Sequence, residues 1–337
     1  MACPDTMNPA AERALLYREA LNEALRLEMR RDERVFCLGV GVAERGGSFK
    51  VTRGLLDEFG PRRVFDTPIA EASFTGLAIG AALTGMRPVV EIIFIDFSTL
   101  ALDQMINQAA KHRFLSGGRE TIPLVLRTQG GVGAGLAAQH SQSLEALYYH
   151  IPGLRLFMPT TPADAKGLLT SAIRCDDPVV FIEHKRLYET SGPVPEGEYC
   201  IEPGKAAVRH PGDDALVIAW SGMVPAALDA ALSLADEGIS AEVLDLRTLV
   251  PLDREAILAS AARTGRVVVA QEAVRRGGVA SDIASIIQEE AFDSLKAPVR
   301  IVAGMNTPIP YPTHLETRVY PDSTRIAETV RELFGGR

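Results

Sequence analysis

Short apolar runs separated by amphipathic stretches make up most of the first half of the chain. The runs are almost continuously hydrophobic and cover residues 35–39, 88–95, 122–126 and 178–182. Continuous rather than alternating runs are typical of strands buried on both faces of a parallel sheet. Helical periodicity between the runs predicts helices over residues 11–31, 74–84, 99–115 and 163–173. The first half therefore predicts an α/β domain with a helix-covered parallel sheet.

A second series of strands and helices alternates in the rest of the chain. Predicted strands cover residues 215–219, 241–246, 267–270 and 299–302, and predicted helices cover residues 224–237, 254–263, 281–292 and 324–334. Strands that alternate with helices favour right-handed crossover units and a second, smaller α/β domain.

The stretch between the two series, residues 189–204, reads ETSGPVPEGEYCIEPG and contains three prolines, three glycines and four glutamates. No periodic pattern runs through it, so it is predicted to be a linker. We therefore divide the chain into a first domain at 1–190, a linker at 191–204 and a second domain at 205–337. Two domains agree with a usual size of about 150 residues per domain.

Composition narrows the classes of function. The 35 basic and 43 acidic residues give a net charge of −8, which argues against a nucleic-acid binder that neutralises phosphates. No apolar run approaches the ~18 residues that span a bilayer. Charged residues precede the first apolar segment, unlike the start of a secretory signal. We expect a cytoplasmic protein that binds neither nucleic acid nor membrane.

Glu71 stands in FDTPIAEASF (65–74), where a strand end precedes it and a helix rich in small residues, TGLAIGAALTG at 75–85, follows it. Small residues permit close packing, so we expect this helix to be buried against another element or a second subunit. A carboxylate at a helix start can interact with the helix dipole, which would be a structural role. A desolvated carboxylate needs a partner, which would equally well be a ligand. The residues alone leave both roles open.

His140 follows a loop with four glycines in six residues, GGVGAG at 130–135. Loops of this kind after a strand often present catalytic groups. The alternative is a histidine that is merely hydrogen-bonded within the loop. Phe97 lies at the end of an apolar run and by itself resembles a core residue.

Several segments together resemble the beta subunit of the thiamine-diphosphate-dependent dehydrogenase component of 2-oxo acid dehydrogenase complexes. The matching segments are KVTRGL (50–55), DTPIAE (66–71), RPVVE (87–91), QHSQ (139–142) and DAKGL (164–168). The resemblance implies a pyrimidine-binding thiamine-diphosphate fold domain followed by a transketolase C-terminal-like α/β domain. It also implies an α2β2 tetramer in which a separate alpha chain holds magnesium and diphosphate. That division would explain why no G-D-G motif with a downstream asparagine occurs here.

The resemblance assigns roles to particular residues. It implies that Glu71 contacts N1′ of the cofactor's pyrimidine, with Ile69, Ile93 and Phe97 around that ring. His140 matches the family's active-site histidine, proposed to assist proton transfer or acyl transfer to the lipoyl group of an acyltransferase. A structural potassium ion is also common in the family, and the matching carbonyl positions are Leu124, Ala172, Ile173, Cys175 and Asp177.

One segment departs from the family pattern. Family members usually read L-G-E-(E/D)-V after the first strand, whereas Val40 and Gly41 replace the acidic pair here. Glu44 is nearby, but its position is displaced. The departure puts in doubt an acid-lined proton path between active sites.

We therefore expect an oxidoreductase subunit that acts on pyruvate, another 2-oxo acid or acetoin. QHSQSL (139–144) and EHKRLY (183–188) look most like acetoin dehydrogenase beta subunits. One alternative is the C-terminal subunit of a split transketolase-type enzyme. Another is a non-catalytic assembly subunit, since the usual acidic pair is missing.

Overall fold

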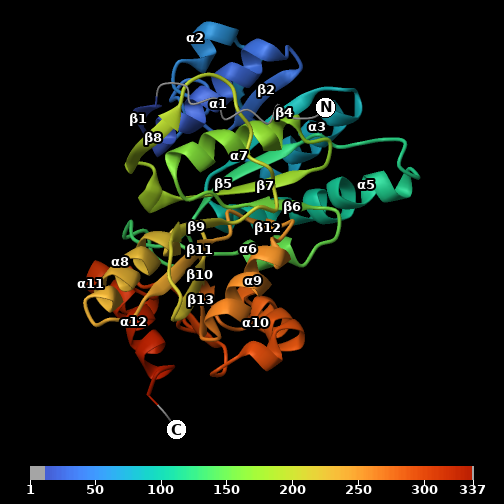
Figure 1. The fold of residues 1–337 in the computed structure, drawn as a ribbon. Helices are drawn as coiled ribbons and strands as arrows, with labels where there is room; N and C mark the ends of the chain where they lie inside the picture. The colour runs from blue at the N-terminus through green and yellow to red at the C-terminus, as the bar shows by residue number, and fades with distance from the viewer. Residues whose placement is uncertain (1–11, 336–337) are drawn as a thin grey trace. The chain divides into compact units, whose positions relative to one another are not determined.

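The computed structural model describes residues 12–335, and these form two compact units. The first unit contains residues 12–130 and 147–203, and the second contains residues 131–146 and 204–335. The predicted division placed residues 131–146 in the first domain, because they precede the predicted linker, whereas in the structure they belong to the second unit. Each unit has its own sheet (Figure 1).

The first unit contains a parallel sheet with the strand order β6-β7-β5-β4-β2-β3. The strands are β2 (Val35–Gly39), β3 (Val64–Asp66), β4 (Arg87–Ile92), β5 (Val125–Gly130), β6 (Arg155–Phe157) and β7 (Val179–His184). The predicted parallel sheet is thus confirmed. β2 and β4 approach closely at Gly39, where a Cβ would lie 2.4 Å from the carbonyl oxygen of Glu91.

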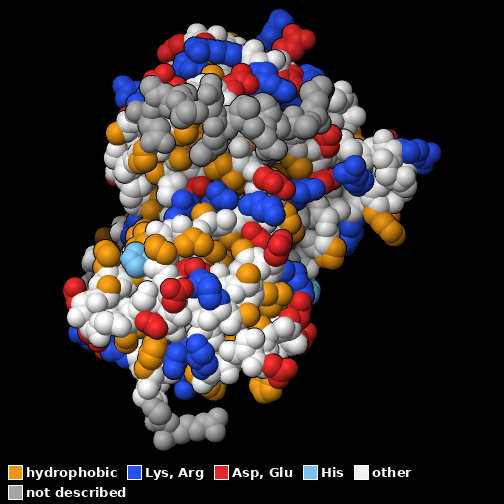
Figure 2. Space-filling model, viewed as in Figure 1, with side chains coloured by type: hydrophobic (Ala, Val, Ile, Leu, Met, Phe, Trp, Pro, Cys, Tyr) orange, Lys and Arg blue, Asp and Glu red, His pale blue; other side chains and the backbone are white. Residues whose placement is uncertain are grey.

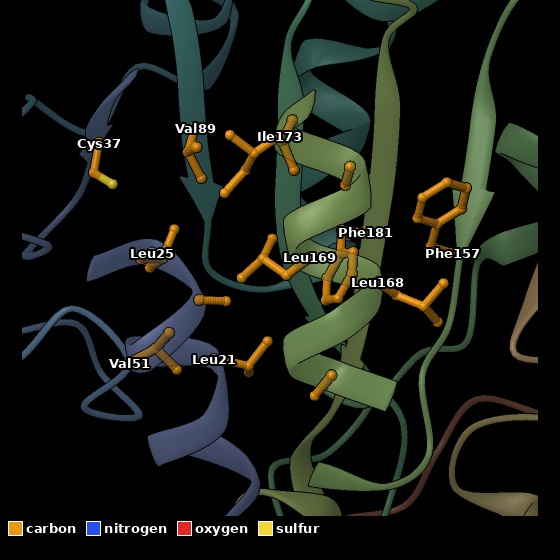
Figure 3. Packing of buried hydrophobic residues seen from close by; sticks show 14 of the residues in the cluster. Leu21, Leu25, Cys37, Val51, Val89, Phe157, Leu168, Leu169, Ile173 and Phe181 are labelled. Atoms are coloured by element: carbon orange, nitrogen blue, oxygen red, sulfur yellow. The ribbon is translucent and has the colours of Figure 1, made fainter. Parts of the chain in front are cut away.

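Two long helices, α1 (Tyr17–Arg31) and α7 (Pro162–Arg174), pack together over the sheet of the first unit. Figure 3 shows Leu21 and Leu25 of α1 and Leu168, Leu169 and Ile173 of α7 among the buried side chains of this core. α3 (Glu71–Leu83) packs against β4. The shorter helices are α2 (Leu55–Phe59), α4 (Ile95–Ser98), α5 (Ala110–Leu115) and α6 (Glu145–Tyr149).

Four predictions for the first half need correction. The strand predicted at 88–95 ends at Ile92, and Ile95 already begins α4. The start of the predicted helix at 11–31 is strand β1 (Glu12–Leu16), which pairs with β8 (Ser191–Pro195) inside the predicted linker. Pairing with a strand so distant in the sequence overrides the local helical pattern. The predicted helix at 99–115 changes pitch from η1 (Thr99–Ala101) through the π-helix η2 (Gln104–Ala109) to α5. The strand predicted at 122–126 begins later, at Val125, and includes Arg127, whose charge is paired.

The second unit has a five-stranded sheet with the order β14-β13-β10-β11-β9. β9 (Ala207–His210) is antiparallel to β11 (Ala241–Asp245), whereas β10 (Ala215–Ala219), β13 (Val267–Val274) and β14 (Arg300–Gly304) run parallel. Helices α8 (Met223–Ala235) and α12 (Ser323–Glu332) lie on one side of the sheet, and α9 (Arg254–Thr264) and α10 (Val279–Glu290) lie on the other (Figure 1). The short elements β12 (Thr248–Val250) and α11 (Thr313–Val319) were not predicted.

Charged side chains of both signs are intermixed on the face shown in Figure 2. Among the ion pairs of the first unit, Arg30 pairs with Glu58 between α1 and α2. In the described part of the chain, no helix is both long enough and apolar enough to cross a membrane.

Candidate active site

The carboxyl ends of three neighbouring strands, β3, β2 and β4, form the edge of the first unit where the predicted cofactor residues lie. β3 is followed by Ile69 and by Glu71 at the start of α3, and β4 is followed by Ile93 and by Phe97 within α4. Ligands of open α/β sheets bind outside the carboxyl ends of the strands. The topology therefore brings these four residues to the edge where a ligand is expected.

Glu71 is the first residue of α3 and is 7% exposed. The N-cap is Ala70, whose carbonyl accepts the N–H groups of Ser73 at 2.9 Å and Phe74 at 3.1 Å. No group among residues 12–335 donates a hydrogen bond to the Glu71 carboxylate or forms an ion pair with it. The carboxylate is near the positive end of the helix dipole but is not used to cap the helix. It is available to a hydrogen-bonding ligand.

The apolar residues predicted beside Glu71 are accessible to different degrees. Ile69 is 80% exposed, and Ile93 and Phe97 are half-buried. This set consists of one aromatic ring, two aliphatic side chains and a carboxylate without a hydrogen-bond donor among the described residues. Such a set suits a flat, partly apolar ring that carries a hydrogen-bonding nitrogen. These residues fit the pyrimidine ring of thiamine diphosphate.

The turn after β2 contains the departure at Val40 and Gly41. Gly41 has φ +72°, a conformation that glycine adopts without strain. Asp66, the last residue of β3, accepts the N–H groups of Ala43 at 2.8 Å and Glu44 at 3.4 Å. Glu44 is exposed, so it does not replace the missing pair as a buried acid.

A buried charged cluster on β4, β5 and β7 escaped the sequence analysis. Arg127 donates to both carboxylate oxygens of Glu183, at 2.7 and 2.8 Å, and to Glu91 Oε2 at 2.7 Å. The hydroxyl of Tyr188 donates to Glu183 at 2.5 Å. None of the four residues is more than 3% exposed. A bidentate pair and a second carboxylate compensate a guanidinium that remains charged at any ordinary pH.

Burial and charge act together on this cluster. Burial raises the pKa of Glu91, while Arg127 opposes the shift and Glu183 adds to it. Burial alone would lower the pKa of Arg127, but the two carboxylates outweigh burial and raise it. A Cβ on Gly47 would lie 3.5 Å from Glu91 Oε1, so the cluster borders the loop after β2. In the sequence, the only sign of this cluster was that the apolar run before residue 127 continues with polar residues at 127–129.

His140 belongs to the second unit, in the loop that precedes α6, and is half-buried. The backbone N–H of His140 donates to the carbonyl of Ala137 at 3.4 Å. Two glutamates of the same unit, Glu272 of β13 and Glu316 of α11, accept hydrogen bonds from this loop. The sequence analysis did not identify either glutamate. Glu71 and His140 are thus held by different units of the chain.

The residues predicted to bind potassium lie near the end of α7 and the neighbouring strands, and comprise Leu124, Ala172, Ile173, Cys175 and Asp177. Arg87 Nη1 donates to the carbonyls of Ile173 at 2.9 Å and Cys175 at 3.0 Å. The Asp177 carboxylate pairs with Arg155 at 2.8 Å. Each carbonyl has a second lone pair, and a helix C-terminus favours a cation. A potassium ion at these positions would share the carbonyls of Ile173 and Cys175 with the Arg87 guanidinium.

Two family models match most of the chain. Residues 13–191 match the transketolase pyrimidine-binding domain, and residues 204–326 match the transketolase C-terminal domain. A solved split-gene transketolase, described as an inactive beta4 tetramer, has a TM-score of 0.76 at 24% identity, covering 95% of this chain and 98% of that one. The fold class predicted from the sequence is confirmed.

Curated relatives match the chain over almost its whole length. The pyruvate dehydrogenase E1 component subunit beta of Rickettsia conorii is 46% identical over 95% of this chain and 98% of that subunit. The acetoin:2,6-dichlorophenolindophenol oxidoreductase subunit beta of Cupriavidus necator is 46% identical over 96% of this chain and 98% of its own length. The corresponding subunit of Bacillus subtilis is 43% identical over 96% of this chain and 98% of its own length. Pyruvate and acetoin enzymes are thus equally similar at the highest of these identities.

Proposed function

The chain belongs to the family of beta subunits of thiamine-diphosphate-dependent 2-oxo acid and acetoin dehydrogenases, and from this premise we propose that it completes its active site with a separate alpha chain. In the assembled enzyme, a 2-oxo acid would lose CO2, or acetoin would be cleaved. The acyl group would then pass to the lipoyl disulfide of an acyltransferase. The disulfide accepts two electrons and opens to a thioester and a thiol.

The proposal depends most on one observation, the buried Glu71 carboxylate that has no donor among residues 12–335. When bound, thiamine diphosphate supplies the carbanion-stabilising chemistry of such enzymes. Glu71 would hold the pyrimidine at N1′ and share a proton with that nitrogen. Phe97, Ile69 and Ile93 would surround the ring with apolar surface and exclude water from it.

His140 would hold or move a proton during acyl transfer. Histidine changes charge near neutral pH, which suits it to this task. His140 follows a glycine-rich loop, so its side chain projects from a loop rather than from a helix. This role belongs to the second unit, whereas proton sharing at the pyrimidine belongs to the first.

One face of α3 supports the need for another subunit. Leu77 is 55% exposed, and a Cβ added to Gly80 would meet no atom within 4 Å. An exposed apolar residue on a helix with little side-chain bulk permits a second helix to approach closely. We assign this face of α3 to a subunit contact in the α2β2 assembly, whose alpha chain would hold magnesium and diphosphate.

Potassium binding at the carbonyls around the end of α7 is a separate part of the proposal. The ion would share the carbonyls of Ile173 and Cys175 with Arg87 and stabilise the connection to β7. Binding to the folded state raises the melting temperature. We expect potassium chloride to raise it more than equimolar sodium chloride, and an equal response to both salts would contradict the site.

Co-expression with an alpha chain tests the proposed function. The purified complex should reduce 2,6-dichlorophenolindophenol with pyruvate or acetoin, and QHSQSL at 139–144 favours acetoin. Two-carbon transfer between sugar phosphates, without either activity, would instead indicate a split transketolase. A complex that binds thiamine diphosphate only through another chain's residues would indicate an assembly subunit. The retention of Glu71, Phe97 and His140 argues against that last outcome.

A further inference from the structure

Glu316 of α11 binds the backbone of the loop that carries His140. Its Oε1 accepts the N–H of Gly133 at 2.9 Å, and its Oε2 accepts the N–H of Gly135 at 3.3 Å. Gly133 and Gly135 have φ +91° and +62°, a backbone form that glycine tolerates and that turns N–H groups toward an anion. The loop therefore binds a carboxylate of its own chain in the way that other backbone turns bind anionic ligands.

The burial of Glu316 makes carboxylate and loop depend on each other. Glu316 is 0% exposed, and within residues 12–335 no Lys, Arg or His forms an ion pair with it. An ionised carboxylate that leaves water is costly unless hydrogen bonds replace its hydration. The two loop amides supply that compensation. In return, the carboxylate fixes the backbone of the loop at Gly133 and Gly135.

Glu272 of β13 holds the two ends of the same loop. Its Oε1 accepts the N–H of Val132 at 3.0 Å and the hydroxyl of Ser143 at 2.8 Å. Next to these two ends, the N–H of Gly131 donates to the carbonyl of Gln142 at 3.0 Å and closes the loop. His140 lies within this closed segment, which is fixed at its base by Glu272 and in its first half, at Gly133 and Gly135, by Glu316.

We propose that Glu316 and Glu272 are positioning residues for His140, because they hold the loop that presents its side chain. The inference rests on the proposed role of His140 in proton transfer during acyl transfer. A proton-transferring group must lie within about 2.6–3.2 Å of its partner atom. A misplacement of about 1 Å can lower a rate ~100-fold. Loss of either anchor should therefore slow the same step that His140 serves.

Hydrogen–deuterium exchange of the assembled enzyme tests the anchoring without using activity. Glu316→Gln keeps the size of the side chain but turns one acceptor into an N–H2 group that faces a loop amide. We expect Gly133 and Gly135 to exchange at least ~10-fold faster, as for the loss of a charged hydrogen bond. Glu289→Gln, at an exposed position of α10, is the matched control. Unchanged exchange in Glu316→Gln would overturn the anchoring.

A milder variant covers the case in which Glu316→Gln does not fold. Ser143→Ala removes one donor to Glu272 and leaves both carboxylates in place. It should accelerate exchange at Val132 and the neighbouring loop amides, whereas exchange in α10 should stay the same. If the loop amides also exchange at the wild-type rate, Glu272 does not hold the loop.

A double-mutant cycle then asks whether Glu316 acts through His140. Glu316→Gln should lower lipoyl-dependent turnover ~10–100-fold in the wild-type background. In the His140→Ala background the further loss should be less than ~2-fold, because residues that act as a unit are not additive. Glu316→Asp, which keeps the charge, should recover part of the rate. Equal losses in both backgrounds would overturn the positioning role.

The outcomes separate this inference from the proposed function. If His140→Ala retains the wild-type turnover, the role of His140 and the positioning role both fail. The family activity would still be judged by turnover with pyruvate or acetoin. If His140→Ala is slow but Glu316→Gln is not, only the positioning role fails.

Discussion

Replacing Glu145 by glutamine should stabilise the protein, and the effect should be larger at alkaline than at acidic pH. Glu145 begins α6 and is 2% exposed. Trp220 Nε1 donates to its Oε1 at 3.4 Å, whereas its Oε2 has no hydrogen-bond partner among the described residues. Burial, reinforced by the negative charge of Glu272, raises the pKa of Glu145 from 4.5 to about 7.

The direction of the pH effect follows from this raised pKa. Since the pKa of Glu145 is higher in the folded chain than in the unfolded one, its stabilising contribution is complete below pH 4.5. The contribution is lost as the pH rises to about 7, where the buried carboxyl ionises. At ~1.4 kcal/mol for each pKa unit, the loss amounts to ~3 kcal/mol. Glutamine keeps the shape and the acceptor oxygen but does not ionise.

Differential scanning calorimetry of wild type and Glu145→Gln between pH 5 and pH 8 measures this difference. The melting temperature of a unit of this size changes by roughly 2–4 °C for each kcal/mol, so the gap should widen by roughly 5–10 °C. Comparison with Glu289→Gln removes the contribution of net charge. A gap that stays constant from pH 5 to pH 8 would refute the reasoning, because Glu145 would then not ionise in that range.

Four further variants or preparations test the site and the core. Glu71→Gln in the assembled enzyme should fold and bind thiamine diphosphate but exchange the cofactor's C2 proton orders of magnitude more slowly. NMR after acid quench measures this exchange, and exchange at the wild-type rate would leave Glu71 as a helix-terminal carboxylate. His140→Ala should retain cofactor binding but lose lipoyl-dependent turnover ~10²–10⁴-fold. Unchanged turnover with a lower melting temperature would make its role structural. The isolated chain should bind thiamine diphosphate weakly and show no turnover until an alpha chain is added, and a fully active preparation without that chain would contradict the assembly. Arg127→Met should lower the free energy of unfolding by ~3–5 kcal/mol in urea titrations, because it leaves Glu91 and Glu183 buried without their cation; a loss below ~1 kcal/mol would mean that water reaches the cluster.

The hydrophobic pattern by itself determined the two α/β units and most of their strands. The prediction for residues 215–219 coincides with β10, because five consecutive apolar residues leave few alternatives to a buried parallel strand. The helix around the small-residue segment was also predicted, although it begins at Glu71 rather than at residue 74. Glu71 and His140 became candidate site residues because a polar residue beside a glycine-rich or small-residue segment is a local signal, and the family resemblance strengthened it; their roles stay predictions.

The tertiary structure alone decided what depends on residues far apart in the sequence. β1 looks helical along the chain and becomes a strand only because β8 pairs with it. Arg127, Glu91 and Glu183 are ordinary charged residues in the sequence, and only the register of β4, β5 and β7 turns them into one buried cluster. Glu316 lies 183 residues from Gly133, and nothing near it in the sequence marks it as the anchor of a loop. Periodicity and motifs report neighbours along the chain, whereas charge pairing and loop anchoring depend on neighbours in space.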